Sequence, residues 1–190
     1  MKNAFLVGKL VYLRALIEDD LRGDYFDWLN DYEVTRYTES GRFANSAMAM
    51  ENYYRSVILN PANVALAIVE TATDRHVGNV KIGPINWVHR CAEFGILIGA
   101  KDCWGKGYGS EATSLIVEYA FRRLNLHKIT LGVHAEHVGA IRAYQHAGFR
   151  EEGRLHEALF LEGRYSDKVL MGVTAEQFFK ARVSAAANSE

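Results

Sequence analysis

The stretch of sequence that decides the fold is Trp104-Gly105-Lys106-Gly107-Tyr108-Gly109-Ser110. It follows an apolar, strand-like run at residues 94–98 and leads into residues 112–121, where apolar side chains recur at helical spacing. Glycines at alternate positions bring backbone N–H groups together with no side chains between them, at the positive end of a helix dipole. The stretch therefore predicts a cradle for an anion, most naturally a phosphate or a pyrophosphate.

Length and composition narrow the class of protein. The chain has 190 residues, which fits one compact domain, and its formal net charge of -1 gives no long-range attraction to nucleic acid or to an anionic membrane. Two cysteines, Cys91 and Cys103, cannot form a disulfide framework and suit a reducing compartment. The apolar stretch near the N-terminus is too short for a signal sequence or a membrane span. We therefore predict a cytoplasmic protein with neither nucleic-acid nor membrane partners.

Hydrophobic periodicity predicts a mixed α/β single domain of the α+β type. A first strand at residues 9–16 precedes short, aromatic-rich helices that reach residue 58. We expect an ordered core over residues 9–183 and a frayed tail at residues 185–190. The other predicted elements are strands at 64–70, 76–87 and 91–99 in an antiparallel meander, a helix at 112–121, a strand at 128–134, a helix from Val138 that ends at Gly148, a hairpin of 149–161 and 165–173, and a last helix opened by a capping box at 174–177.

Three kinds of phosphate site compete for the glycine-rich stretch. A Walker A loop ends in Gly-Lys-Ser/Thr at a fixed spacing, and that ending is absent here. A dinucleotide fingerprint has a different glycine spacing and opens an early βαβ unit, whereas this turn lies past the middle of the chain. The third kind, which we favour, is a site for the pyrophosphate of coenzyme A.

Three segments in sequence order resemble the acetyl-CoA-binding core of the GNAT superfamily, in its ribosomal-protein-alanine and spermidine N-acetyltransferase-like branch. They are AEFGI at residues 92–96, the glycine loop, and HVGAIRAYQHAGF at residues 137–149. The resemblance covers residues 91–149. The sequence departs from the family pattern at three positions: Trp104 replaces a polar residue, His137 replaces Asn, and Ala140 replaces a frequent Ser.

The resemblance implies one domain over residues 1–190, with a central, mostly antiparallel twisted sheet of about seven strands, a splayed parallel pair and flanking helices. It implies acetyl-CoA as the co-substrate. A backbone N–H around Leu97 or Ile98 would stabilise the thioester oxygen as it becomes an oxyanion. The residues that the resemblance places at the cofactor are Leu97, Ile98, Trp104, Gly105, Lys106, Gly107, Tyr108, Gly109, Ser110 and His137.

Two further residues are the catalytic candidates that the resemblance implies. The attacking alkylamine, with a pKa near ~10, must lose a proton, and Glu93 is the candidate base. The departing thiolate needs a proton, and Tyr144 is the candidate acid. Each has a plainer interpretation, since Glu93 could pair with Arg90 or a lysine at the surface and Tyr144 shares helical spacing with Val138 and so could be core.

The histidines do not predict a metal site. His134 and His137 have an H-x-x-H spacing, but it crosses a predicted strand–helix junction and lacks a nearby cysteine or carboxylate pattern. We therefore expect no metal, and we interpret both cysteines as ordinary thiols, since direct attack of an amine on a thioester needs no covalent enzyme intermediate.

The amine acceptor stays open among a protein N-terminus, a polyamine and an amino-sugar nucleotide. The rival function is a non-catalytic acyl-CoA-binding module with the same fold, and a homodimer also stays open. A polyamine would favour an acidic pocket, to which the candidate contributors are Glu18, Asp19, Asp20, Asp24, Asp27 and Asp31. An amino-sugar nucleotide would favour basic and aromatic residues such as Arg36, Tyr37, Arg42 and Phe43.

Overall fold

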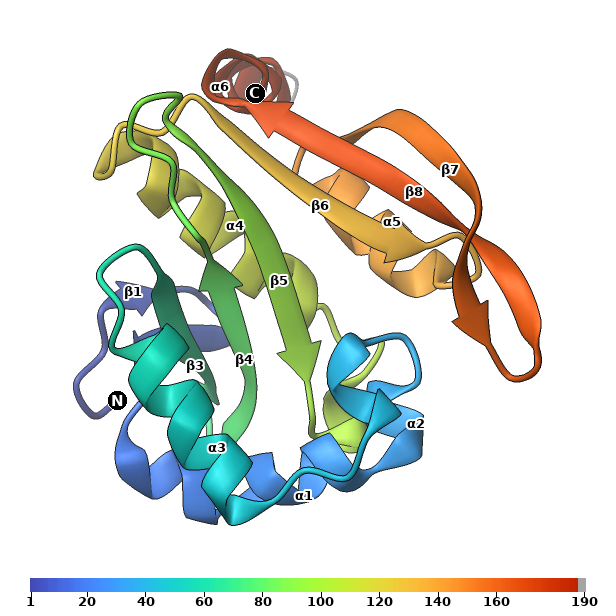
Figure 1. Ribbon diagram of the computed structural model, residues 1–190. Helices are drawn as coiled ribbons and strands as arrows, with labels where there is room; N and C mark the ends of the chain where they lie inside the picture. Colours follow the sequence, from blue (N-terminus) through green and yellow to red (C-terminus); the bar gives the residue numbers. More distant parts are fainter. Residues whose placement is uncertain (188–190) are drawn as a thin grey trace.

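A computed structural model describes residues 1–187, and within them the strands form one eight-stranded sheet in the order β1-β2-β3-β4-β5-β6-β8-β7 (Figure 1). This is the mixed, mostly antiparallel sheet with flanking helices that the sequence predicts. The strands are β1 (Leu6–Val7), β2 (Val11–Ala15), β3 (Val64–Glu70), β4 (His76–Ile82), β5 (Cys91–Ile98), β6 (Lys128–His134), β7 (Arg150–Leu161) and β8 (Arg164–Thr174).

The predicted meander of three strands is confirmed, with one correction at the end of β4. Strands β3, β4 and β5 pair antiparallel, but β4 ends at Ile82 and not at Trp87. Gly83 has φ +143°, and a Cβ at this position would collide with Asn63, so the backbone turns away here in a conformation that only glycine adopts easily. Residue 84 is a proline, which has no N–H to donate to a continued ladder.

Strands β5 and β6 form the parallel pair, and they separate early. In the described part of the chain their pairing consists of three residue pairs, Cys91↔Lys128, Ala92↔Ile129 and Glu93↔Thr130. Beyond that point β5 continues to Ile98 and β6 to His134 without pairing to each other. The predicted splay is thus confirmed. It opens the centre of the sheet between β5 and β6, each of which stays hydrogen-bonded to its other neighbour, β4 and β8 respectively.

The helices cover both faces of the sheet. Helices α4 and α5 lie behind it in the view of Figure 1, α3 lies in front of its lower part, and α1 runs below the lower ends of the strands. The helical elements are η1 (Glu18–Arg22), α1 (Asp24–Asn30), α2 (Tyr32–Thr35), η2 (Glu39–Arg42), α3 (Ala47–Tyr53), η3 (Tyr54–Ile58), η4 (Lys101–Cys103), α4 (Tyr108–Arg122), α5 (Val138–His146) and α6 (Ala175–Ala187).

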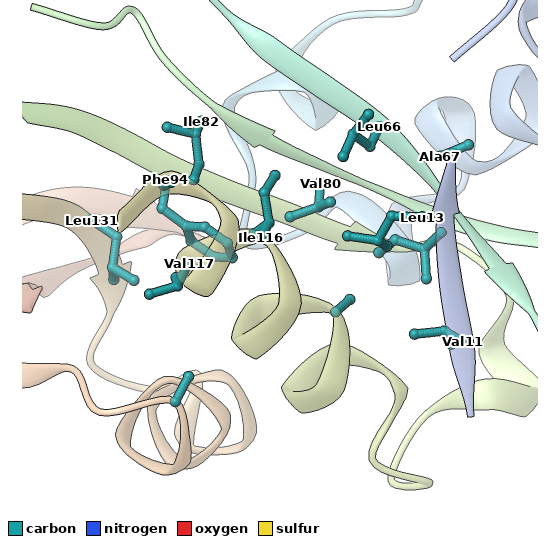
Figure 2. Close-up of a cluster of buried hydrophobic side chains, with 14 of the residues drawn as sticks. Val11, Leu13, Leu66, Ala67, Val80, Ile82, Phe94, Ile116, Val117 and Leu131 are labelled. Atoms are coloured by element: carbon teal, nitrogen blue, oxygen red, sulfur yellow. The ribbon is translucent and has the colours of Figure 1, made fainter. Parts of the chain in front are cut away.

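The core lies between α4 and the sheet. Ile116 and Val117 of α4 are fully buried, and they lie in one apolar cluster with Val80 of β4 and Phe94 of β5 (Figure 2). Burying a side chain of this size stabilises the fold by roughly 1.5–3 kcal/mol. Packing against the sheet therefore fixes the axis of α4, and with it the position of the helix N-terminus.

Helix α4 begins earlier than the sequence predicts. Its first residue is Tyr108 and not Ala112, because Gly107 adopts a left-handed conformation at φ +87° and serves as the N-cap. Gly109 and Ser110 consequently lie in the first helical turn. The glycine-rich stretch is therefore the start of the helix itself and not only the loop before it.

The C-terminal part of the chain follows the prediction closely. The capping box forms, since Gln177 N–H donates to the Thr174 hydroxyl at 3.3 Å and Thr174 N–H donates to the Gln177 side-chain oxygen at 3.0 Å. Helix α6 runs to Ala187, so it includes residues 185–187 of the predicted frayed tail. The rest of that tail lies outside the described residues.

Candidate active site

A cavity of about 860 Å³ lies where β5 and β6 diverge, and we call it the splay cavity. Its walls come from both strands, from the glycine turn, from α5 and from the α2 region. Glu93, Tyr144, His137 and all but one of the predicted cofactor residues line it. The exception is Lys106, which is exposed and outside the described lining.

The N-terminus of α4 forms one end of the splay cavity. Gly105 at φ +72° and Gly107 at φ +87° both have left-handed backbones, which turn the chain sharply into the helix. The first N–H groups of a helix have no intrahelical acceptor, so those of Tyr108, Gly109 and Ser110 are available to an anion at the positive end of the helix dipole. This end of the cavity suits a pyrophosphate.

Two side-chain hydrogen bonds hold the glycine turn against the sheet. The indole N–H of Trp104 donates to the Ile98 carbonyl oxygen at 2.8 Å, and the Tyr108 hydroxyl donates to Glu70 at 2.5 Å. The bond to Glu70 is the main reason that the pKa of Tyr108 rises to about 12. Trp104 thus has a structural contact at the position where the family pattern has a polar residue.

The direction of the β5 amides distinguishes Leu97 from Ile98. Gly83 N–H donates to the Glu93 carbonyl at 2.8 Å, and Gly99 N–H donates to the Val77 carbonyl at 3.0 Å, so odd-numbered residues of β5 bond toward β4. The register between these points is continuous. Because consecutive peptide groups in a strand point to opposite edges, the N–H of Leu97 points to β4 and that of Ile98 points into the splay.

Glu93 lies at the closed end of the splay. Its side chain is exposed to the cavity, and in the described residues it has no ion pair. The alternative partner does not approach it, since Arg90 donates instead to the Asn125 side-chain oxygen at 3.2 Å. Glu93 shares a strand face with Gly95 and Leu97, as alternation predicts.

Tyr144 combines the two roles that the sequence left open. Its ring packs edge-on against Phe94, with centroids 5.7 Å apart, and lies 6.1 Å from Phe149, so its body belongs to the core. It also lines the splay cavity. Burial raises the pKa of the Tyr144 phenol to about 12, which keeps it protonated at neutral pH.

A cluster of aromatic rings closes the other side of the splay cavity. His137, just before α5, stacks on Tyr37 with centroids 4.3 Å apart and planes 18° apart. Burial, then the charges of Arg36 and His134, lower the pKa of His137 to about 4, so its ring is neutral at pH 7. His134 is 5% exposed, and its Nδ1 has no partner among the described residues. The sequence considered His134 only as a metal ligand, and residues 1–187 contain no cluster that could hold a metal ion.

A second cavity, of about 410 Å³, adjoins the first, and we call it the α1–α3 cavity. It lies between helices α1 and α3 and the sheet face that carries Asn79 and Lys81 of β4. Thr38, Gly95 and Leu97 line both cavities, so the two lie next to each other along β5. The sequence singled out neither Asn79 nor Lys81, because two polar residues in a strand carry no signal of their own.

The acceptor residues proposed from sequence are only partly at these cavities. Arg36 and Tyr37 line the splay cavity, whereas Phe43 is 84% exposed and Arg42 lies outside both described linings, paired at 2.6 Å with Glu39 at the edge of the splay cavity. None of the six acidic candidates at positions 18–31 lines either described cavity. The buried one, Asp20, accepts two bonds of 2.7 Å from Arg14 instead. The predicted acidic pocket is therefore not formed by these side chains.

Comparisons with known proteins agree with this geometry. Residues 11–150 match the family model of the acetyltransferase (GNAT) domain. The chain is 40% identical over 166 residues to spermidine N(1)-acetyltransferase of Vibrio cholerae serotype O1, covering 87% of this chain and 94% of that protein. It is 32% identical over 169 residues to spermidine N(1)-acetyltransferase of Escherichia coli K12, covering 88% of each.

A solved structure shows the same architecture. Spermidine N-acetyltransferase from Vibrio cholerae in complex with CoA and spermine superposes with a TM-score of 0.81 and 32% identity, over 90% of this chain and 99% of that one. The chain therefore belongs to the GNAT family of acetyltransferases. It is an acetyl-CoA-dependent N-acetyltransferase, and the relatives described here act on spermidine. In residues 1–187, no helix is both long and apolar enough to cross a membrane.

Proposed function

We propose that this protein transfers the acetyl group of acetyl-CoA directly to a primary amine in a ternary complex formed in the splay cavity. The observation that supports this most is the position of three chemically different groups around one opening. These are the N-terminus of α4, the inward-pointing N–H of Ile98, and the unpaired carboxylate of Glu93. Each matches one requirement of acyl transfer to an amine.

The N-terminus of α4 anchors the cofactor in this proposal. The N–H groups of Tyr108, Gly109 and Ser110 donate to the pyrophosphate, and the absence of side chains at Gly105 and Gly107 lets it approach the backbone. Anchoring at this end directs the acetyl group along β5 toward the closed end of the splay. Lys106 contributes at most long-range charge, because it lies outside the described lining.

Ile98, Glu93 and Tyr144 carry out the chemistry in this proposal. The Glu93 carboxylate takes the proton of the acceptor ammonium, directly or through a water, and the free amine attacks the thioester carbon. The N–H of Ile98 donates to the carbonyl oxygen as it becomes an oxyanion. The C–S bond then breaks, and the Tyr144 hydroxyl gives its proton to the departing thiolate. The Tyr144 phenolate regains a proton from the attacking nitrogen and Glu93 passes the first ammonium proton to solvent, so the products are the amide, CoA thiol and one proton.

The acceptor is the part of the proposal that the relatives inform. Three candidates are a polyamine, an amino-sugar nucleotide and a protein N-terminus. The relatives of Vibrio cholerae and Escherichia coli act on spermidine, which supports a polyamine. The non-catalytic alternative has less support, since the chain retains a carboxylate at position 93 and a tyrosine at position 144.

The test is release of CoA thiol from acetyl-CoA in the presence of spermidine, an amino-sugar nucleotide, or peptides with different N-terminal residues. We expect release with one class of amine. Binding of acetyl-CoA without release from any class would favour the acyl-CoA-binding module. Absence of acetyl-CoA binding would contradict the proposed role of the α4 N-terminus.

A further inference from the structure

We propose that the acceptor of this enzyme is an amino sugar that carries a phosphate, held in the α1–α3 cavity by Lys81 and Asn79, and not a polyamine. The proposal rests on the proposed transferase function and specifies its acceptor. The α1–α3 cavity has a positive charge and no negative one, because its described lining includes Lys81 but no carboxylate.

Lys81 is a half-buried cation without a partner. It projects from β4 on the face covered by α1 and α3, and within residues 1–187 its ammonium group has no ion pair or hydrogen bond. Its cross-strand neighbour is Gly95, where an added Cβ would meet nothing within 4 Å. The glycine therefore leaves room beside the ammonium group, and a partly buried, unpaired cation is a binding group for an anion.

Asn79 places a second donor beside Lys81. The Nε2 atom of His76 lies 2.9 Å from both the Gly78 carbonyl oxygen and the Asn79 Oδ1. A ring nitrogen next to a backbone carbonyl must carry the proton, so Asn79 Oδ1 is the acceptor and its Nδ2 is turned away. That Nδ2 is buried and has no acceptor in the described chain. Residues 79 and 81 share one face of β4, so the two donors lie on the same floor.

Most of the carboxylates that line the splay cavity already form ion pairs with basic side chains. Glu33 lies 3.0 Å from Lys101, Glu39 lies 2.6 Å from Arg42, and Glu136 lies 2.9 Å from Arg164. Among the described lining residues this leaves Glu93 as the carboxylate without a cation. A polyamine keeps at least one further ammonium group while its first one reacts, and that group would face Lys81 with no unpaired carboxylate beside it.

The walls of the α1–α3 cavity suit a sugar ring. Tyr25 and Tyr53 provide aromatic faces, and Leu29 and Met50 provide apolar surface, on which the C–H face of a pyranose packs. The volume of about 410 Å³ falls in the range of small-molecule sites. Leu97 and Gly95 line both this cavity and the splay cavity, and Glu93 is next on the same face of β5, so the amine of a sugar held here would point along that face toward the proposed base.

The experiment is calorimetric titration of the full chain, saturated with CoA, with glucosamine 6-phosphate, UDP-glucosamine and spermidine. We expect at least one of the two sugar phosphates to bind at least tenfold more tightly than spermidine. Lys81→Met and Asn79→Ala should each weaken that binding at least fivefold. Lys81→Glu should reverse the preference toward spermidine. Arg55→Glu is the matched charge reversal, because Arg55 is exposed and outside both cavities.

Two results would overturn the proposal. One is spermidine binding as tightly as, or more tightly than, both sugar phosphates. The other is that the Lys81 and Arg55 charge reversals weaken sugar-phosphate binding equally. That result would show that the net charge of the protein, and not a contact with Lys81, governs the binding. Both results leave the transferase function intact if CoA is released with spermidine. Failure of CoA itself to bind would instead contradict the proposed function, so the two failures are distinguishable.

Discussion

Glu93 on β5 lies opposite Thr130 on β6, and in residues 1–187 this is the last pair that the two parallel strands form. The carboxylate therefore stands where the sheet begins to open. Its neighbours farther along β5 have amides that alternate between β4 and the opening, which puts the Ile98 N–H on the side of the substrate. The pairing of β5 with β4 and β6 thus directs both the proposed base and the proposed oxyanion donor toward the opening.

Replacing Glu93 by Gln tests the base through its pH dependence. A primary alkylamine has a pKa near ~10, so the base is needed at neutral pH and less so in alkali. We expect kcat/KM to fall about 100-fold at pH 7.5, with the loss shrinking as the pH approaches 10. The measurement is CoA thiol release across this range, with exposed Glu18→Gln as the control. A loss that does not change with pH would assign Glu93 a structural role.

Replacing Tyr144 by Phe tests the acid. We expect kcat to fall about 100-fold while the Kd for acetyl-CoA changes little, because the ring and its packing on Phe94 are retained. Tyr119→Phe is the matched control, since Tyr119 packs on Phe5 and lies outside both described cavities. The pKa of Tyr144 of about 12 also predicts that its ionisation causes no alkaline decline in rate below about pH 11. Unchanged turnover would remove Tyr144 from the mechanism.

Replacing Gly107 by Glu tests the anion cradle. The change puts a side chain and a negative charge at the N-cap of α4, and we expect the Kd for acetyl-CoA to rise at least tenfold, or about 1.4 kcal/mol. Gly163→Glu is the control, since Gly163 has a similar backbone at φ +82° in the β7–β8 turn. Both variants should lose about 1–2 kcal/mol of stability, because a side chain is strained in a left-handed conformation. Equal cofactor affinity in the two variants would refute the cradle.

Replacing Asp20 by Asn tests a buried ion pair that supports the α1 region. Burial alone would raise the pKa of Asp20, but bonds from Arg14 and from the Ile17 N–H outweigh it and lower the pKa. A carboxyl whose pKa is lowered by folding adds stability above its unfolded pKa of about 4, and this stability is lost as the pH falls below that value. We expect the variant to be about 3 kcal/mol less stable at pH 7.

The control for Asp20 is its exposed neighbour, Asp19→Asn, which should change stability little. Urea unfolding at pH 7 and at pH 3 measures both variants. The deficit of the Asp20 variant should shrink at pH 3, because the carboxyl is protonated in the unfolded wild-type chain below its unfolded pKa of about 4. A deficit of the same size at both values would show that shape, and not charge, is what Asp20 contributes.

Local chemistry was enough to predict much of this protein from sequence. The strand at 128–134 has the predicted bounds, the capping box at Thr174 forms, and the meander and the last hairpin pair antiparallel as predicted. The glycine turn was recognised because glycine spacing and helix dipoles act over a few residues. These features depend on neighbours in the chain, so the sequence specifies them directly.

Tertiary structure decided what depends on distant partners. The carboxylate of Glu111 accepts bonds from the N–H groups of Lys9, Leu10 and Val11, which ties the start of β2 to α4 across about a hundred residues of chain. Neither segment has a sequence pattern that predicts this contact. Likewise Asn63, just before β3, occupies the space where a side chain at Gly83 would lie.

The functional site shows the same division. The sequence by itself was enough to propose the residues for the chemistry, because Glu93, the glycine turn and Tyr144 lie in short recognisable segments. The direction of the backbone amides became clear only from the folded sheet, in which the N–H of Ile98, and not that of Leu97, points into the splay. The same is true of Asn79 and Lys81, which lie together on the floor of a second cavity. The physical reason is that amide direction and side-chain neighbours follow from strand register, which is set by packing between elements far apart in the chain.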